Sequence, residues 1–116
     1  MTCKWSPHAN SQFLDILAQI GLALYMEDAY RWREKILAEV EQLSLFPFLG
    51  PGIPPECFST IPANIERLRQ IVCDPYRIVY EIVDDEIHIL SIRHTRMLVA
   101  EGDTHWHWRS NKQCTL

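Results

Sequence analysis

The first half of the chain carries apolar residues at helical spacing in two successive blocks. In the first block they recur at intervals of three and four residues, at Phe13, Ile16, Leu17, Ile20 and Leu24. Ser6 and Pro7 precede this block and are typical of a helix N-cap and first turn, and Gly21 is expected to end or kink the helix. A second helix is predicted from about Tyr25 to Leu45, with its apolar stripe at Ala29, Trp32, Ile36, Val40 and Leu43. Together they predict a helical hairpin that packs against another layer.

The remaining elements are predicted as strands. Residues 2–5 form a short first strand, and three more are expected at Ile65–Cys73, Tyr76–Val83 and Glu86–Thr95. A two-residue turn at Asp84-Asp85 joins the last two. The segment from Pro47 to Pro62 holds five of the seven prolines, so a long surface connection is expected there. The order β-α-α-β-β-β predicts an α+β fold, with an N-terminal helical hairpin packed on a mainly antiparallel sheet. One domain is expected over residues 1–98, followed by a C-terminal tail over residues 99–116.

Composition and charge narrow the class of protein. The 116 residues are 47 % hydrophobic and 22 % charged, which is typical of one soluble globular domain. No apolar run approaches the ~20 residues of a membrane helix, and the N-terminus lacks the apolar core of a signal peptide. We therefore expect a cytoplasmic protein that does not associate with membranes. The net charge of −4 gives no overall attraction to nucleic acid, and the four cysteines, none in a Cys-x-x-Cys pair, are expected to be free thiols.

The predicted strands concentrate arginine at one end of the sheet. The turn at Asp84-Asp85 would pair Glu81 with His88, Val79 with Leu90, and Arg77 with Ile92. This pairing puts Arg77, Val79, Glu81, His88, Leu90, Ile92, His94 and Arg96 on one open face. It directs Tyr76, Ile78, Tyr80, Ile82, Ile87, Ile89, Ser91 and Arg93 toward the helices. All five basic residues between positions 61 and 100 are arginines, which suits the recognition of phosphate or carboxylate. The alternative is a solvated strand end in which the arginines pair with Glu66, Asp74 or Glu81.

A series of short segments occurs in an order that is typical of one family. They are Trp5-Ser6-Pro7 with Ala9, Phe13 to Ile16, Leu43 to Pro47, Leu68-Arg69, Tyr76 to Ile82, Asp85 to Leu90, and Arg93-His94-Thr95-Arg96. Through them residues 2–97 resemble the RelE/ParE superfamily, the toxins of bacterial type II toxin–antitoxin pairs, also called plasmid stabilisation proteins. The resemblance implies the topology predicted above and a cytosolic toxin that arrests bacterial growth. It also implies a cognate antitoxin that wraps a disordered or helical tail around the toxin and covers its arginine end.

The resemblance leaves two activities open. RelE-like members cleave messenger RNA in the ribosomal A site without a metal, whereas ParE-like members inhibit DNA gyrase and have no established catalytic machinery. In a nuclease, Arg77 would stabilise the phosphate charge, and His94 and Glu81 would act as acid and base. The last strand ends in His94-Thr95-Arg96-Met97, which matches all but the final position of the His-x-Arg-Arg ending of many ParE-like members. The net charge of −4 departs from the basic surface of RelE-like members, so the sequence favours the ParE-like activity.

In either case the target, DNA gyrase or the ribosome with its mRNA, is expected to bind Arg69, Arg77, Arg93, His94 and Arg96. A non-toxic binding module on the same fold is a further alternative. No cofactor and no metal are expected. The alternating His105 and His107 could meet His94 and Cys114 at a zinc ion, but no carboxylate or second cysteine stands at ligand spacing. Trp106 and Trp108 are expected to pack on the domain or on a partner.

Overall fold

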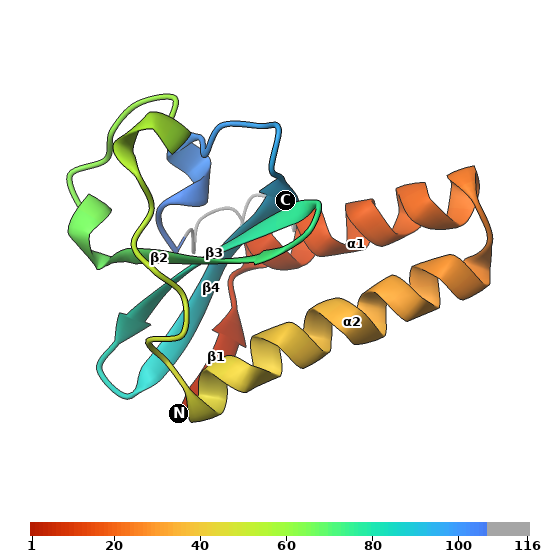
Figure 1. The fold of residues 1–116 in the computed structure, drawn as a ribbon, viewed down its shortest axis with the longest axis horizontal. Helices are drawn as coiled ribbons and strands as arrows, with labels where there is room; N and C mark the ends of the chain where they lie inside the picture. The colour runs from red at the N-terminus through yellow and green to blue at the C-terminus, as the bar shows by residue number, and fades with distance from the viewer. Residues whose placement is uncertain (107–116) are drawn as a thin grey trace, which may run out of the picture.

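The structure, a computed structural model, describes residues 1–106. Its main elements are β1 (Thr2–Trp5), α1 (Pro7–Ala23), α2 (Met26–Leu45), β2 (Leu68–Cys73), β3 (Tyr76–Val83) and β4 (Glu86–His94). Short 3₁₀ turns lie at Pro55–Cys57, Ile65–Arg67 and Glu101–Asp103. The strands form one sheet in the order β1-β4-β3-β2, in which β1 runs parallel to β4 and the other pairs are antiparallel. The predicted α+β fold with its β-α-α-β-β-β order is therefore confirmed (Figure 1).

The helical hairpin begins where the sequence predicts. Ser6 is the N-cap of α1, and its side chain accepts a hydrogen bond of 3.0 Å from the amide of Ala9. The expected end at Gly21 is wrong, because α1 continues to Ala23. Gly21 lies so close to Met26 that an added Cβ would stand 3.3 Å from its sulfur, so this glycine lets the two helices approach near the turn of the hairpin.

One hydrophobic core lies between the hairpin and the sheet. Phe13 from α1, Ile36 and Leu43 from α2, and Ile78 and Ile87 from the sheet are all buried in it. The sheet side chains alternate, so one set of isoleucines meets the apolar stripes of both helices. Figure 1 shows that only the parts of the helices near β1 and β4 cover the sheet, and that the hairpin projects well beyond its edge.

A second hydrophobic core lies on the opposite face, so the expectation of an open face is wrong. Ile53 and Phe58 from the Pro-rich connection and Val99 from the segment after β4 pack on Leu68, Val79 and Leu90. The covering segments are joined to each other, since the Val99 amide donates to the Cys57 carbonyl at 2.8 Å. Apolar residues on both faces of the central strands require a cover on both sides, and the long connection supplies it.

The strand boundaries differ slightly from the prediction. Residues 65–67 form a 3₁₀ turn, so β2 begins at Leu68 rather than Ile65, and β4 ends at His94 rather than Thr95. The two-residue turn at Asp84-Asp85 is confirmed. Asp84 adopts a φ of 55° there, a left-handed conformation that aspartate tolerates better than most residues.

Candidate functional site

The register between β3 and β4 changes within the pair, and this change decides which face each candidate residue occupies. Near the turn, Glu81 pairs with His88 as predicted, and Tyr80 pairs with Ile89. Leu90 is then an extra residue in β4, which forms a β-bulge. Beyond the bulge the pairs are Val79 with Ser91, Ile78 with Ile92, Arg77 with Arg93, and Tyr76 with His94. The predicted pairs of Val79 with Leu90 and Arg77 with Ile92 are therefore wrong.

The bulge moves His94 away from the other candidate residues. Ile92 is buried in the core beneath the helices, and His94 lies on the same face, with its ring 6.0 Å from that of Tyr76. Its Nδ1 accepts a hydrogen bond of 3.1 Å from the Arg96 amide. Arg93, by contrast, stands opposite Arg77 on the other face. The expectations that His94 shares a face with Arg77 and Glu81, and that Arg93 faces the helices, are both wrong.

The start of α1 holds the bulge in place. The side-chain oxygen of Gln12 accepts the Ile92 amide at 2.9 Å. Ser6 donates its backbone amide to the Ile89 carbonyl at 2.9 Å and its hydroxyl to the Leu90 carbonyl at 3.2 Å. These bonds pair backbone groups of β4 at and beyond the point where its neighbour β1 ends, at Trp5.

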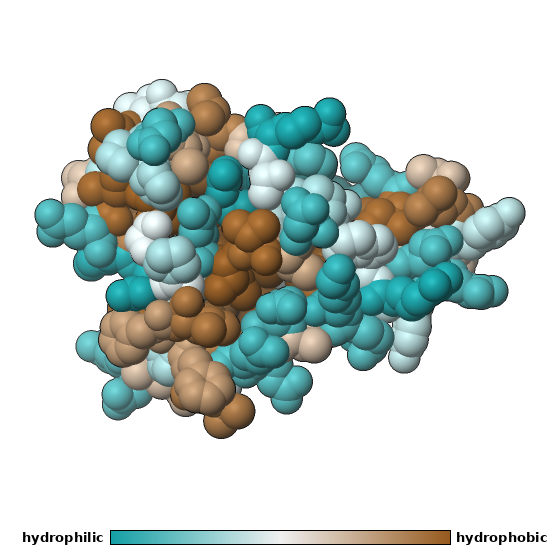
Figure 2. Space-filling view, viewed as in Figure 1, coloured by the Kyte–Doolittle hydropathy of each residue, from teal (hydrophilic) through white to brown (hydrophobic). Residues whose placement is uncertain are grey.

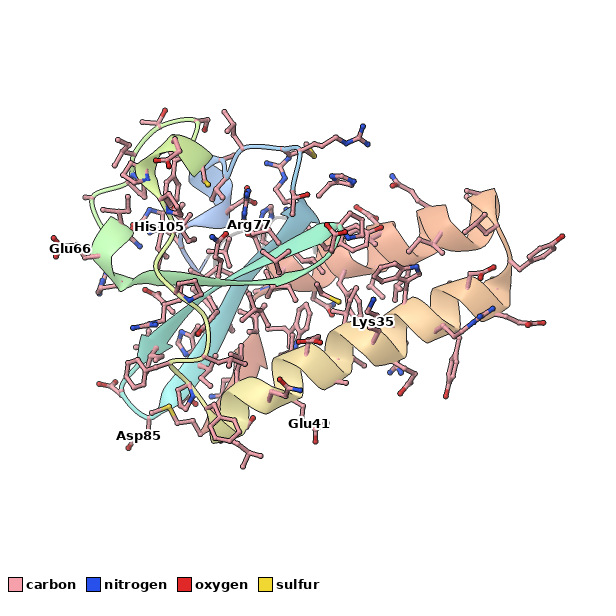
Figure 3. All side chains as sticks on the ribbon, viewed as in Figure 1. Lys35, Glu41, Glu66, Arg77, Asp85 and His105 are labelled. Atoms are coloured by element: carbon pink, nitrogen blue, oxygen red, sulfur yellow. The ribbon has the colours of Figure 1, made fainter. Side chains whose placement is uncertain are left out.

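Arg77 lies on the face away from the helices, beside the segment that follows β4 (Figure 3). Its Nη1 donates to the Met97 carbonyl at 3.2 Å, and its Nη2 stands 3.9 Å from the Cys57 sulfur. Within residues 1–106 its buried Nε has no hydrogen-bond partner. Arg77 thus contacts both the Pro-rich connection and the segment after β4, and its Nε–H group remains available as a hydrogen-bond donor.

The other candidate residues have different roles in the structure. Arg69 pairs with Tyr80 on the helix side of the sheet, where its Nη1 donates to the Gly50 carbonyl at 2.5 Å. Its guanidinium lies 4.8 Å from the centre of the Phe48 ring, so Arg69 binds the start of the Pro-rich connection to the sheet. Glu81 is only 8 % exposed on the Arg77 face, and Arg96 is exposed in the turn after β4. The structure therefore pairs Arg77 with Arg93 and places Glu81 on the same face, four residues along β3, whereas Arg69 and His94 lie on the opposite face.

Sequence reasoning missed Asp103, whose buried carboxylate joins α1, β4 and the 3₁₀ turn Glu101–Asp103. It accepts from Arg93 at 3.0 Å and from Gln12 at 3.1 Å, lies 2.8 Å from His8 Nε2, and accepts the Ala100 amide at 2.9 Å. Burial alone would raise the pKa of Asp103, but the His8 hydrogen bond, the Ala100 amide, the Arg93 charge and the Gln12 amide together outweigh it. The pKa therefore lies below its ordinary value, and the group is an anion at neutral pH. No motif marked this residue, because it follows the last predicted strand.

An apolar groove of about 580 Å³ runs between α1 and α2 near the turn of the hairpin. Its lining is Leu17, Ala18, Gly21, Leu22, Met26, Ala29, Tyr30 and Arg33. Leu22 is 89 % exposed and Met26 is 77 % exposed, so these side chains present apolar surface to solvent. Figure 2 shows this apolar strip on the hairpin and a second apolar patch at the other end of α2, where Leu45, Phe46 and Phe48 are exposed.

The described part of the chain offers no metal centre. Within residues 1–106, no group of three or more His, Cys, Asp or Glu residues could hold a metal ion. His107 and Cys114, which were considered as zinc ligands, lie outside the described residues. Cys3, Cys57 and Cys73 are free thiols. No helix within residues 1–106 is long and apolar enough to span a membrane.

The fold is similar to that of a solved structure described as the chromosomal ParDE TA system from P. aeruginosa. The TM-score is 0.65 at 23 % sequence identity, over 81 % of this chain and 95 % of that chain. No curated protein matches the sequence. The model of the family described as "ParE toxin of type II toxin-antitoxin system, parDE" matches residues 3–99. This chain therefore belongs to the ParE toxin family.

Proposed function

We propose that this protein is a cytoplasmic toxin that arrests bacterial growth by inhibiting DNA gyrase, and that a cognate ParD-like antitoxin neutralises it. The observation that carries the choice of gyrase over mRNA is the placement of His94. This residue lies on the helix side of the sheet, whereas Arg77 and Glu81 lie on the opposite side.

Metal-independent RNA cleavage requires an acid, a base and a cation around one phosphate, each within hydrogen-bond reach of the reacting atoms. Here the sheet separates the candidate acid from the candidate base and cation. Glu81 is also buried beneath the covering segments. An inhibitor that acts by binding needs no such triad, which supports the gyrase-directed activity of the ParE-like branch.

The test is the topology of a reporter plasmid in cells that express the toxin. Inhibition of gyrase relaxes the plasmid before growth stops and leaves total mRNA intact. A ribosome-dependent nuclease would deplete mRNA while the plasmid stays supercoiled. Growth arrest with unchanged plasmid supercoiling would overturn the gyrase proposal.

The antitoxin, in this proposal, seats an apolar helix in the groove between α1 and α2. The groove walls are almost entirely apolar, and Leu22 and Met26 stand exposed at its rim. An amphipathic helix that folds on contact would bury this surface, which is a common mode of peptide recognition. The sequence predicts antitoxin contacts at the arginine end of the sheet. The sheet face that carries Arg77 and Arg93, named here the arginine face, is already covered by the chain itself, so the groove is the better docking surface.

A further inference from the structure

The segment that follows the family match occupies the arginine face of the sheet. Residues 100–106, named here the C-terminal strap, lie beyond residue 99, where the match to the ParE family ends. Asp103 and Thr104 of the strap are each 1 % exposed. Two residues beyond the family match are thus buried as deeply as the core of the domain, while the rest of the strap is exposed or half-buried.

Polar bonds anchor the strap at two consecutive residues in its middle, Asp103 and Thr104. Asp103 is bound by His8 and Gln12 of α1 and by Arg93 of β4. The Thr104 carbonyl accepts the side-chain amide of Asn64 at 2.9 Å. The Trp106 ring then packs against that of His88 in a tilted arrangement, with 4.8 Å between the ring centres and 52° between their planes. The strap therefore ties the segment before β2 to α1 and β4.

Arg93 and Arg77 emerge side by side from paired positions on β4 and β3. Two like charges in direct cross-strand opposition repel each other, and a nearby anion offsets that repulsion. The Asp103 carboxylate supplies that anion to Arg93, while Arg77 has only a carbonyl and a thiol. Asp103 therefore neutralises one of the two guanidinium groups, as an acidic group of a binding partner would.

The covered arginine face also contains buried polar atoms without hydrogen-bond partners. Within residues 1–106, four buried polar atoms on this face have no hydrogen-bond partner, namely Gln70 Oε1, Arg77 Nε, Glu81 Oε2 and Ser91 Oγ. A polar group of a binding partner that reaches these atoms would form hydrogen bonds with them. This face is better suited to a polar partner than to permanent burial.

We propose that the C-terminal strap is an autoinhibitory segment, with Asp103 acting as an intramolecular substitute for an acidic group of the target protein. In the closed state, with the strap in place, Asp103 masks Arg93, so the toxin must release the strap before this side chain can bind its target. This inference rests on the proposed function in one respect, that the arginine face engages the target. Mass action between the strap and the target then sets the potency of the toxin.

The test uses the full-length chain and two readouts. The first is the rate at which phenylglyoxal, an arginine-specific reagent, modifies Arg93, measured by mass spectrometry against the 72 %-exposed side chain of Arg31 as internal standard. The second is the inducer dose that arrests growth. Asp103→Asn keeps the shape of the side chain but removes the anion, and Asn64→Ala releases the other side of the strap without a charge change. Glu101→Gln, an exposed carboxylate in the same 3₁₀ turn, is the matched control.

Asp103→Asn should speed Arg93 modification about tenfold, because a charge-assisted hydrogen bond is lost, and should lower the arresting dose. Asn64→Ala should act in the same direction, and Glu101→Gln should change neither readout. If neither Asp103→Asn nor Asn64→Ala changes the rate of Arg93 modification, the inference is overturned. It is also overturned if Arg93 is modified faster but growth arrest is unchanged or weaker, in variants whose circular dichroism shows a native fold. If neither the wild-type chain nor Asp103→Asn arrests growth, the proposed function fails, while the modification rate still decides whether Asp103 masks Arg93.

Discussion

Arg77 and Arg93 are direct partners in the β3–β4 register, so two guanidinium groups leave the same face of the sheet from adjacent strands. Only the bulge at Leu90 brings them together, because an unbroken register would place Ile92 opposite Arg77. The same bulge sends His94 to the helix side. One extra residue in β4 thus creates an arginine pair and separates the residues that a nuclease would need.

Arg77→Ala should weaken growth arrest strongly and the fold mildly. The side chain binds the Met97 carbonyl and approaches the Cys57 sulfur, so its loss should lower the free energy of unfolding by about 1 kcal/mol. Arg67→Ala, which removes the same charge from an exposed turn, is the control. The measurements are urea unfolding and the inducer dose for arrest. Equal toxicity of Arg77→Ala and wild type at equal protein level would exclude Arg77 from target binding.

Gly50→Ala should destabilise the protein by more than about 2 kcal/mol, since an added Cβ would collide with the backbone carbonyl of Gln70 and stand 2.9 Å from the Tyr80 ring. The Gly50 amide also donates to the Tyr80 hydroxyl at 3.0 Å, and that hydroxyl donates to the Pro47 carbonyl. Gly52→Ala is a stringent control, because a Cβ there meets nothing within 4 Å. Thermal unfolding of the two variants should separate clearly, and similar melting temperatures would contradict the close approach at Gly50.

The contribution of Asp103 to stability should depend on pH. The folded pKa of this carboxyl is lowered, so its stabilisation is present above the unfolded value, near 3.8, and is lost as pH falls through the folded pKa. At pH 7 the wild-type chain should exceed Asp103→Asn by about 1–3 kcal/mol in the free energy of unfolding. The difference should shrink in acid, where the carboxyl loses its ion pair with Arg93 and its bond with His8. A difference that is constant between pH 7 and pH 3 would contradict this assignment.

Leu22→Asp should weaken binding of the cognate antitoxin by tenfold or more, because burial of one leucine is worth about 1.5–3 kcal/mol. Leu45→Asp makes the same change at the second apolar patch, at the other end of α2, and should leave the affinity near wild type. Calorimetry at about 0.05 M and 0.5 M salt should give similar affinities, since apolar burial is not screened. A greater loss with Leu45→Asp would place the antitoxin on the second patch.

The fold was predictable because its local signals agree. Ser6 and Pro7 mark the start of α1, the apolar stripes define both helices, and the Asp84-Asp85 turn fixes the first pairs of the β3–β4 hairpin. The bulge was not predicted, because Leu90 and Ile92 are apolar and fit either register. A signal does exist, since the apolar positions of β4 change phase between Ile89 and Ile92, three residues apart instead of two. The register is fixed by a distant residue, as Gln12 binds the Ile92 amide.

The second hydrophobic core, on the face away from the helices, was not predicted for a related reason. Ile53 and Phe58 lie in a Pro-rich segment without periodicity, so nothing local indicates that they form a core. Asp103 likewise gains its role only from His8, Gln12 and Arg93, which are 95, 91 and 10 residues away in sequence. Contacts at such sequence separation depend on the finished fold, and a single sequence does not reveal them.

The most direct test of the central claim is the supercoiling of relaxed plasmid by purified DNA gyrase in the presence of this protein. Wild-type toxin should inhibit the reaction in a dose-dependent way, Asp103→Asn should do so at lower concentration, and Arg77→Ala should be much weaker. The same preparations should leave mRNA intact on translating ribosomes. Undiminished supercoiling at toxin concentrations well above those of gyrase, together with cleavage of ribosome-bound mRNA, would contradict the account.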